Sequence, residues 1–256
     1  MTGQTTSPLV ESDAPRMPAA NAAEEWRGYL QFLKRPDLPQ GTASYKTGVI
    51  GTMRIFGLDL IVMFIILSVL FAVIAAGFEL PENYNSTLEL NFSFVLLAVV
   101  VAPVIEELAF RSWLTGRPRF LYALGVLFIT GIIAVIVWAA ISGPAGETAP
   151  GLVILAGMGA AVIASILGWK RTAPEWFAPI FPAAFWLSSA AFALVHLFNY
   201  AEGALWVLLP LIVPQFILGT MAAYVRVQYG FVYAVLLHAA HNGFAISVAA
   251  LSMQSG

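Results

Sequence analysis

The stretch VVVAPVIEELAFRSW, residues 99–113, decides the fold class because it places charged side chains directly after a long apolar run. The sixteen residues from Leu90 to Ile105 carry no charge, which is typical of a segment embedded in a membrane. A carboxylate is costly in hydrocarbon, and ionisable groups in membrane segments usually face a bundle interior or a wet cavity. Glu106 and Glu107, with Arg111 four residues after the second, therefore need a structural or chemical reason.

The composition of the whole chain indicates an integral membrane protein. Of its 256 residues 60% are hydrophobic and only 10% are charged, whereas soluble domains carry about 25% charged residues. A net charge of −2 gives no reason to expect a nucleic-acid partner. The absence of cysteine excludes a disulfide framework and thiolate chemistry.

The N-terminal segment, residues 1–54, is predicted to be a cytoplasmic extension of a membrane domain over residues 55–252. Residues 1–20 are rich in Pro, Ala, Ser and Thr and are predicted to be disordered. Asn21, followed three residues later by Glu24, predicts the start of an amphipathic helix over residues 22–35. We expect this helix to lie on the membrane surface, the alternative being a solvated helix that binds a partner.

Hydropathy predicts an all-α polytopic protein with seven spans and no cleavable signal peptide. The distribution of Lys and Arg agrees, because six of the twelve precede the first span and the others fall in alternate loops. By the positive-inside rule the N-terminus is then cytoplasmic and the C-terminus lies outside. The expected spans are residues 55–78, 90–114, 120–142, 151–169, 179–200, 204–225 and 230–252.

The two glutamates differ in the partner that the sequence offers them. Glu107 and Arg111 are spaced i, i+4, so they share a helix face and can pair. Glu106 is turned about 100° away and is left without that partner. If the helix continues to Leu114, Glu106 lies about 12 Å inside it. The alternative is that both glutamates end the helix at the interface, with the arginine snorkelling to water.

Few other ionisable residues fall inside the predicted spans. The stretch FALVHLFNY places Phe192 and His196 on one helix face, and LLHAAHNGF places His238 and Asn242 on another. His241 is turned away from that second face, and we expect it either to support the site residues or to pack. Asp59, near the start of the first span, is expected to reach lipid headgroups or to pair locally.

Together these residue types predict amide hydrolysis without a covalent intermediate. A glutamate that is not paired with the arginine can act as general base for a water molecule, and a histidine facing it can hold the same water. A second histidine and an asparagine amide can donate hydrogen bonds to the oxyanion. A Glu–His–His set could instead hold zinc with an open water position, although no HExxH helix is present.

Three motifs in this order resemble those of the CAAX protease and bacteriocin-processing (CPBP) family of intramembrane proteases, related to the type II CAAX prenyl endopeptidase. EELAFR, FALVH and HAAHN fit the family's EExxxR, FxxxH and HxxxN, and they extend over residues 106–242. The resemblance implies that Glu106 and His196 activate a water and that His238 and Asn242 form the oxyanion site. It further implies that Glu107 pairs with Arg111, that Phe192 packs beside the site, and that no cofactor is needed.

The chain departs from the family pattern at two places. Ser112 stands where the family often has glycine, and Glu106 and His196 are 90 residues apart, a longer gap than in many bacterial relatives. Residues 120–169 account for the excess and are predicted to be an inserted pair of helices. An even number of crossings preserves the orientation of the spans that follow, so the motif helices can still face each other.

We therefore expect an intramembrane endopeptidase that acts on a membrane-associated protein or peptide in the lipid bilayer, with a bacterial inner membrane as its location. One alternative is a catalytically silent scaffold or bacteriocin-immunity protein of the same fold. Another is a proton-coupled transporter, since intramembrane Glu and His suit proton relays. The absence of an internal repeat counts against transport.

Overall fold

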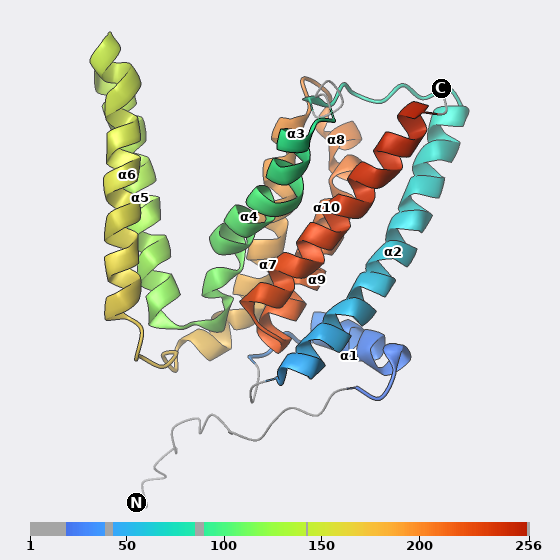
Figure 1. Ribbon diagram of the computed structural model, residues 1–256, viewed down its shortest axis with the longest axis horizontal. Coiled ribbons are helices and arrows are strands. Elements are labelled where there is room, and N and C mark those ends of the chain that lie inside the picture. Colours follow the sequence, from blue (N-terminus) through green and yellow to red (C-terminus); the bar gives the residue numbers. More distant parts are fainter. Residues whose placement is uncertain (1–18, 39–42, 85–89, 142, 255–256) are drawn as a thin grey trace, which may run out of the picture. The chain divides into compact units, whose positions relative to one another are not determined.

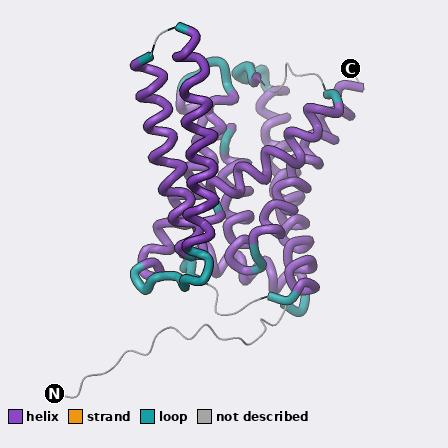
Figure 2. Tube along the Cα trace, turned by 60° about the vertical axis from the view of Figure 1, so that its left-hand side comes forward, coloured by secondary structure: helices purple, strands orange, loops and turns teal. Residues whose placement is uncertain are grey.

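The structure is a computed structural model that describes residues 19–38, 43–84, 90–141 and 143–254, with only the backbone of residues 144–147 and 252–254. The predicted disordered start lies outside these residues, apart from Ala19 and Ala20. Throughout the described residues the elements are helices, and Figure 2 shows no strand among them. The all-α prediction is confirmed.

The helices follow one another along the chain as labelled in Figure 1. Two of the intervening elements are 3-10 helices, Ser112–Thr115 and His196–Asn199, and one is a π-helix, Leu97–Val101. The α-helices are α1 (Ala22–Lys34), α2 (Tyr45–Ala75), α3 (Phe92–Leu96), α4 (Ala102–Phe110), α5 (Pro118–Ala140), α6 (Pro144–Leu167), α7 (Phe177–Val195), α8 (Leu205–Leu211), α9 (Val213–Gln228) and α10 (Phe231–Gln254).

Six stretches of described helix are long and apolar enough to cross a membrane. A seventh crossing results if α8 and α9, which meet at a bend of 42°, count as one span. Pro210 and Pro214 flank the bend, and neither offers an N–H to carry the helical ladder through it. The predicted number of spans is confirmed in this sense, while the orientation of the termini stays a prediction.

The predicted span 90–114 is not one continuous α-helix. It consists of α3, the π-helix and α4, which ends at Phe110, and a 3-10 helix then covers Ser112–Thr115. The prediction that the α-helix continues to Leu114 is therefore wrong. Pro103 explains the irregularity before α4, because its ring removes the N–H that a regular ladder would need at that position.

Helix α1 starts as predicted, with the side-chain oxygen of Asn21 accepting the N–H of Glu24 at 3.0 Å. Its apolar side is buried within the protein. The rings of Tyr29 and Phe32 pack edge-on against Tyr224 of α9, at 5.4 and 5.2 Å between centroids. Figure 1 shows α1 at the end of the helix bundle where α2 begins. Its position on a membrane surface stays a prediction.

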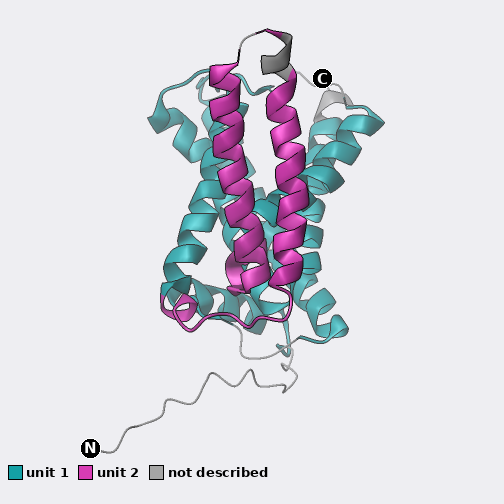
Figure 3. Ribbon diagram, turned by 90° about the vertical axis from the view of Figure 1, so that its left-hand side faces the viewer, with its two compact units in different colours: residues 1–111, 180–256 teal, residues 112–179 magenta. Residues whose placement is uncertain are grey.

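The chain forms two compact units, residues 1–111 with 180–256, and residues 112–179 (Figure 3). In the first, α10 packs against α2, α4 and α9, and every residue of α9 from Leu218 to Gln228 is buried. The second is the hairpin of α5 and α6, in which Gly157 admits Thr130 so closely that a Cβ would lie 2.2 Å from it. This hairpin contains the predicted helix pair 120–169, whose origin as an insertion stays a prediction.

Candidate active site

The first element of the site is a buried ion pair at the end of α4. Nη1 of Arg111 lies 3.1 Å from Oε1 of Glu107, and both side chains are fully buried. A snorkelling arginine would keep its guanidinium in water. The snorkelling arginine of the alternative is therefore wrong, and the predicted i, i+4 pair is present.

The end of α4 is itself held by side chains from other helices. The last carbonyls of a helix have no intrahelical donor and must find partners elsewhere. The hydroxyl of Ser188 in α7 donates to the carbonyl of Phe110, and Nε of Arg226 in α9 donates to that of Arg111 at 3.1 Å. The contact between Arg226 and the end of α4 was not predicted from the sequence. The buried role of Arg226 follows from the early end of α4, which the sequence alone did not predict.

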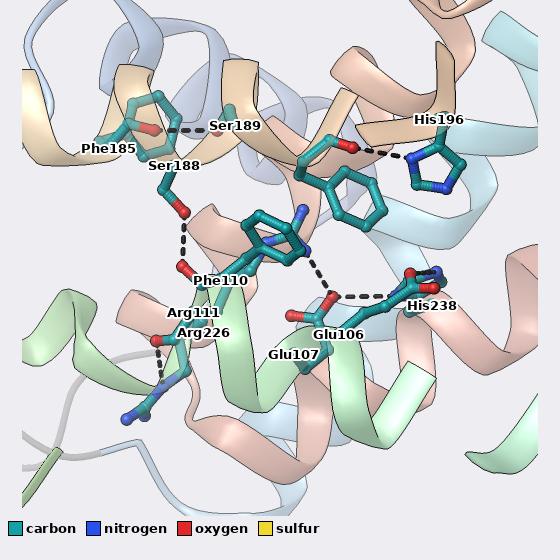
Figure 4. A network of polar contacts seen from close by, with 11 residues as sticks. Glu106, Glu107, Phe110, Arg111, Phe185, Ser188, Ser189, His196, Arg226 and His238 are labelled. Atoms are coloured by element: carbon teal, nitrogen blue, oxygen red, sulfur yellow. Dashed lines mark hydrogen bonds and ion pairs between the residues drawn. The ribbon is translucent and has the colours of Figure 1, made fainter. Parts of the chain in front are cut away.

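His238 of α10 lies between the two adjacent glutamates (Figure 4). Its Nδ1 is 2.9 Å from Oε1 of Glu107, and its Nε2 is 3.5 Å from Oε2 of Glu106. An ionised carboxylate can only accept hydrogen bonds, so Nδ1 carries the proton that Glu107 accepts. The side chain of Glu106 is 29% exposed, whereas that of Glu107 is not exposed at all. Glu106 is thus the carboxylate that a substrate can reach.

The ring of Phe192 connects the three motifs in space. Cζ of Arg111 stacks over it at 3.8 Å from the centroid. The rings of His196 and His238 contact it edge-on, with centroids 4.8 and 5.4 Å away. Because the guanidinium is over the ring face and the imidazoles lie beside it, this one fully buried side chain fixes the spacing between them. The structure therefore brings together residues from α4, α7 and α10.

His196 follows the last residue of α7 and opens the 3-10 helix His196–Asn199. Its Nδ1 lies 2.7 Å from the carbonyl oxygen of Phe192 and must donate to it. In the neutral ring Nε2 then carries a lone pair and can accept a hydrogen bond. Figure 4 shows His196 and His238 coming to the site from different helices.

Asn242 lies one turn after His238, and its amide nitrogen donates to the carbonyl of Ala98 at 2.8 Å. The π-helix explains why that carbonyl is available. The N–H of Ala102 goes to Leu97, five residues back, so Ala98 receives nothing from it. The next donor at the same spacing would be Pro103, which has no N–H. The irregular backbone before α4 therefore provides the acceptor that orients Asn242.

The same helix carries a second carboxylate–imidazole pair away from these motifs. Nδ1 of His241 lies 2.8 Å from Oδ2 of Asp59, which is fully buried in α2. The expectation that Asp59 reaches headgroups or pairs locally is wrong. Arg54, its nearest basic neighbour in sequence, donates to the carbonyl of Ala19 instead.

Several polar atoms of the site are buried without a hydrogen-bond partner. They are Oε2 of Glu107 and Nε and Nη2 of Arg111, together with Oε2 of Glu106 and Nη1 of Arg111, whose contacts with His238 and Glu107 are ion pairs only. Buried polar atoms are nearly always hydrogen-bonded, so a concentration of exceptions suits a site that takes up a polar ligand. In the described part of the chain, no group of three or more His, Asp or Glu side chains is arranged to hold a metal ion. The zinc alternative therefore gains no support from the geometry.

Residues 167–244 match the family model Rce1-like, described as type II CAAX prenyl endopeptidase Rce1-like. No curated protein and no solved structure matches the chain. The matched segment contains FALVH and HAAHN, and the resemblance predicted from the motifs is confirmed there. EELAFR lies outside the segment, but the contacts of Glu107 with His238 and of Arg111 with Phe192 join it to the other two motifs.

Proposed function

We propose that this chain, which resembles type II CAAX prenyl endopeptidases over residues 167–244, is an intramembrane endopeptidase that hydrolyses a peptide bond of a membrane-associated protein or peptide. The observation that carries the proposal is the position of His238 between a reachable carboxylate, Glu106, and a buried one, Glu107. We place the enzyme in a bacterial inner membrane with its N-terminus in the cytoplasm, in keeping with the distribution of Lys and Arg.

In the first step Glu106 acts as general base. A water between Glu106 and the substrate gives one proton to the carboxylate, while its oxygen bonds to the scissile carbonyl carbon. The π electrons of the carbonyl move to its oxygen, which becomes an oxyanion. His196 supports this role because its Nδ1 is committed to the carbonyl of Phe192, which leaves Nε2 to accept a hydrogen bond from the same water.

In the second step the tetrahedral intermediate collapses. The C–N bond breaks as the carbonyl re-forms, and Glu106 returns its proton to the leaving nitrogen. His238, when both ring nitrogens carry protons, donates from Nδ1 to Glu107 and from Nε2 to the oxyanion. The amide of Asn242 has two N–H donors, of which one is used on Ala98 and the other is free for the oxyanion. The cycle forms no covalent enzyme intermediate and needs no metal.

The remaining motif residues act by positioning. Glu107 fixes the tautomer and orientation of His238, and Arg111 balances the charge of Glu107 in a fully buried environment. Phe192 holds the guanidinium and both imidazoles apart at fixed distances. Glu107 and Phe192 contact catalytic side chains, and Arg111 acts through these two residues.

The test is cleavage of a library of membrane-tethered peptides by the purified full-length protein, with Glu106→Ala and His238→Ala beside it. We expect either substitution to lower kcat/KM by about 10²–10⁴-fold, the usual contribution of a general base or an oxyanion donor. His241→Ala is the matched control, because it removes an imidazole three residues away on the same helix that contacts Asp59 instead.

A zinc chelator added to each reaction separates the two hydrolytic mechanisms. Cleavage that resists the chelator and disappears in both site variants supports the glutamate-activated water. Cleavage that is lost with the chelator would indicate that the same residues bind a metal ion. A folded wild-type protein that cleaves nothing would contradict the proposal and favour a scaffold or immunity role, and proton flux linked to a solute in liposomes would favour transport.

A further inference from the structure

The unit formed by residues 112–179 has a pocket of its own, whose lining contains none of the three motifs. Its volume is about 470 Å³, and it is formed by the start of α5 and the segment that follows α6. Its lining residues include Leu121, Tyr122, Lys170, Arg171, Thr172 and Trp176. Neither the proposed peptide hydrolysis nor the family match assigns a role to this pocket.

The pocket is positively charged and has no carboxylate in its lining. Lys170 and Arg171 both line it, and neither forms an ion pair within the described residues. Instead, Nη1 of Arg171 donates to the hydroxyl of Tyr122 at 3.1 Å, which leaves the charge of the guanidinium uncompensated. Two adjacent cations at one pocket repel each other, and an anion placed between them relieves that repulsion.

A third cation adds to the positive potential at the same end of the hairpin. The guanidinium of Arg119 stacks between the rings of Phe120 and Trp169, with Cζ 4.4 and 4.5 Å from their centroids. Its Nε is buried without a hydrogen-bond partner. The stacking fixes the position of this charge without neutralising it, so this end of the hairpin attracts anions.

The position of the pocket points to a lipid as the source of the anion. It lies where α5 begins and α6 has just ended, which is the level of the lipid headgroups for two spans of this length. Trp176 and Trp169 are largely exposed there, as expected for aromatic side chains at a membrane interface. Exposed apolar side chains continue along both helices, among them Phe128 and Val162, and offer a surface for acyl chains.

We propose that this pocket binds the headgroup of an anionic phospholipid. Lys170 and Arg171 pair with the phosphate, the hydroxyl of Thr172 donates a hydrogen bond to it, and Trp176 lies beside the glycerol and the upper acyl chains. Basic pockets at the ends of membrane helices are suited to such headgroups because they combine charge with access from the lipid phase. The proposal concerns a binding site and does not depend on peptide hydrolysis.

The experiment is native mass spectrometry of the full-length protein in detergent, titrated with dioctanoyl phosphatidylglycerol or dioctanoyl phosphatidylcholine. The test variant is Lys170→Gln with Arg171→Gln. The control is Arg27→Gln with Lys46→Gln, which removes the same charge from two exposed residues outside this unit. Each cation near an anionic headgroup contributes about fivefold in affinity, so we expect the test variant to bind phosphatidylglycerol about 30-fold more weakly. The control should change by less than about threefold.

Two further arms separate the loss of charge from misfolding and a lipid from a free anion. Exchanging the two cations, Lys170→Arg with Arg171→Lys, should keep the binding, and far-UV circular dichroism should show equal helicity in all variants. Equal binding of the two lipids, or unchanged binding by the test variant, would overturn the proposal. Inorganic phosphate that displaces phosphatidylglycerol at equal concentration would assign the site to a free anion instead of a lipid.

Discussion

Helix α10 carries two carboxylate–imidazole pairs that look alike in isolation and differ in their surroundings. His238 meets Glu107 at 2.9 Å, and His241, three residues later, meets Asp59 at 2.8 Å. His238 also has a second carboxylate, Glu106, at 3.5 Å from its other ring nitrogen. The second oxygen of each buried carboxylate has no hydrogen-bond partner, but Oε1 of Glu107 also pairs with Arg111, whereas Oδ2 of Asp59 pairs with His241 alone among the described residues. A short contact between a histidine and a carboxylate therefore does not distinguish the two pairs, and we propose catalysis at His238 because of the additional charged groups beside it.

The largest difference should follow from changing each carboxylate to its amide. Glu107→Gln leaves the buried guanidinium of Arg111 without a counter-charge, which typically costs about 3–5 kcal/mol in the free energy of unfolding. Asp59→Asn keeps an acceptor for His241 and removes a buried charge that has no cation, so we expect a change below about 1 kcal/mol. Unfolding by sodium dodecyl sulfate in mixed micelles measures both. Equal losses would contradict the distinction between the pairs.

The next largest effect concerns the two imidazoles and is measured as activity. His238→Gln should lower kcat/KM for a cleaved peptide by about 10³-fold, because it removes the group proposed to stabilise the oxyanion. His241→Gln should change it by less than about threefold, since this side chain ties α10 to α2 on another face. The comparison requires only that both variants elute as monodisperse protein. A comparable loss of kcat/KM in the two variants would indicate that both pairs have a structural role.

Substitutions of Asn242 test whether the π-helix, by orienting this side chain, contributes to activity. Asn242→Ala should lower kcat/KM by about 10²-fold, at the lower end of the range for an oxyanion donor. Asn242→Asp keeps an oxygen of similar shape but has no N–H to offer to the carbonyl of Ala98 or to an oxyanion, so it should be no better. An active Asn242→Asp enzyme would show that the amide donor is not used.

The smallest expected effect probes the packing around Phe192. A Cβ on Gly219 would lie 3.1 Å from Cδ1 of Phe192 and 3.2 Å from Nη2 of Arg111, so Gly219→Ala should shift both side chains slightly. We expect a loss of about 1 kcal/mol in stability and a few-fold loss in kcat/KM. Gly57→Ala in α2 is the matched control, because a Cβ there meets nothing within 4 Å. That substitution should stabilise the helix by up to about 1 kcal/mol.

The local sequence predicted the features that depend on neighbours along one helix. The start of α1 at Asn21 follows from a side chain that caps its own helix, and the pairing of Glu107 with Arg111 follows from their spacing. The sequence did not predict the end of α4 at Phe110. That end depends on Ser188 and Arg226, which are far away along the chain and supply the donors that its last carbonyls need.

The amino-acid sequence by itself determined that this is an all-helical membrane protein with three motifs in a recognisable order, because apolar length and helical spacing are local properties. Only the tertiary structure decided which histidine meets which carboxylate. The spacing along α10 did not determine which carboxylates His238 and His241 would contact, and Asp59 was expected to reach lipid headgroups or to pair locally. Packing of α10 between α2 and α4 assigned Asp59 to His241 and both glutamates to His238, since a buried charge is stable only where a distant part of the chain brings a partner to it.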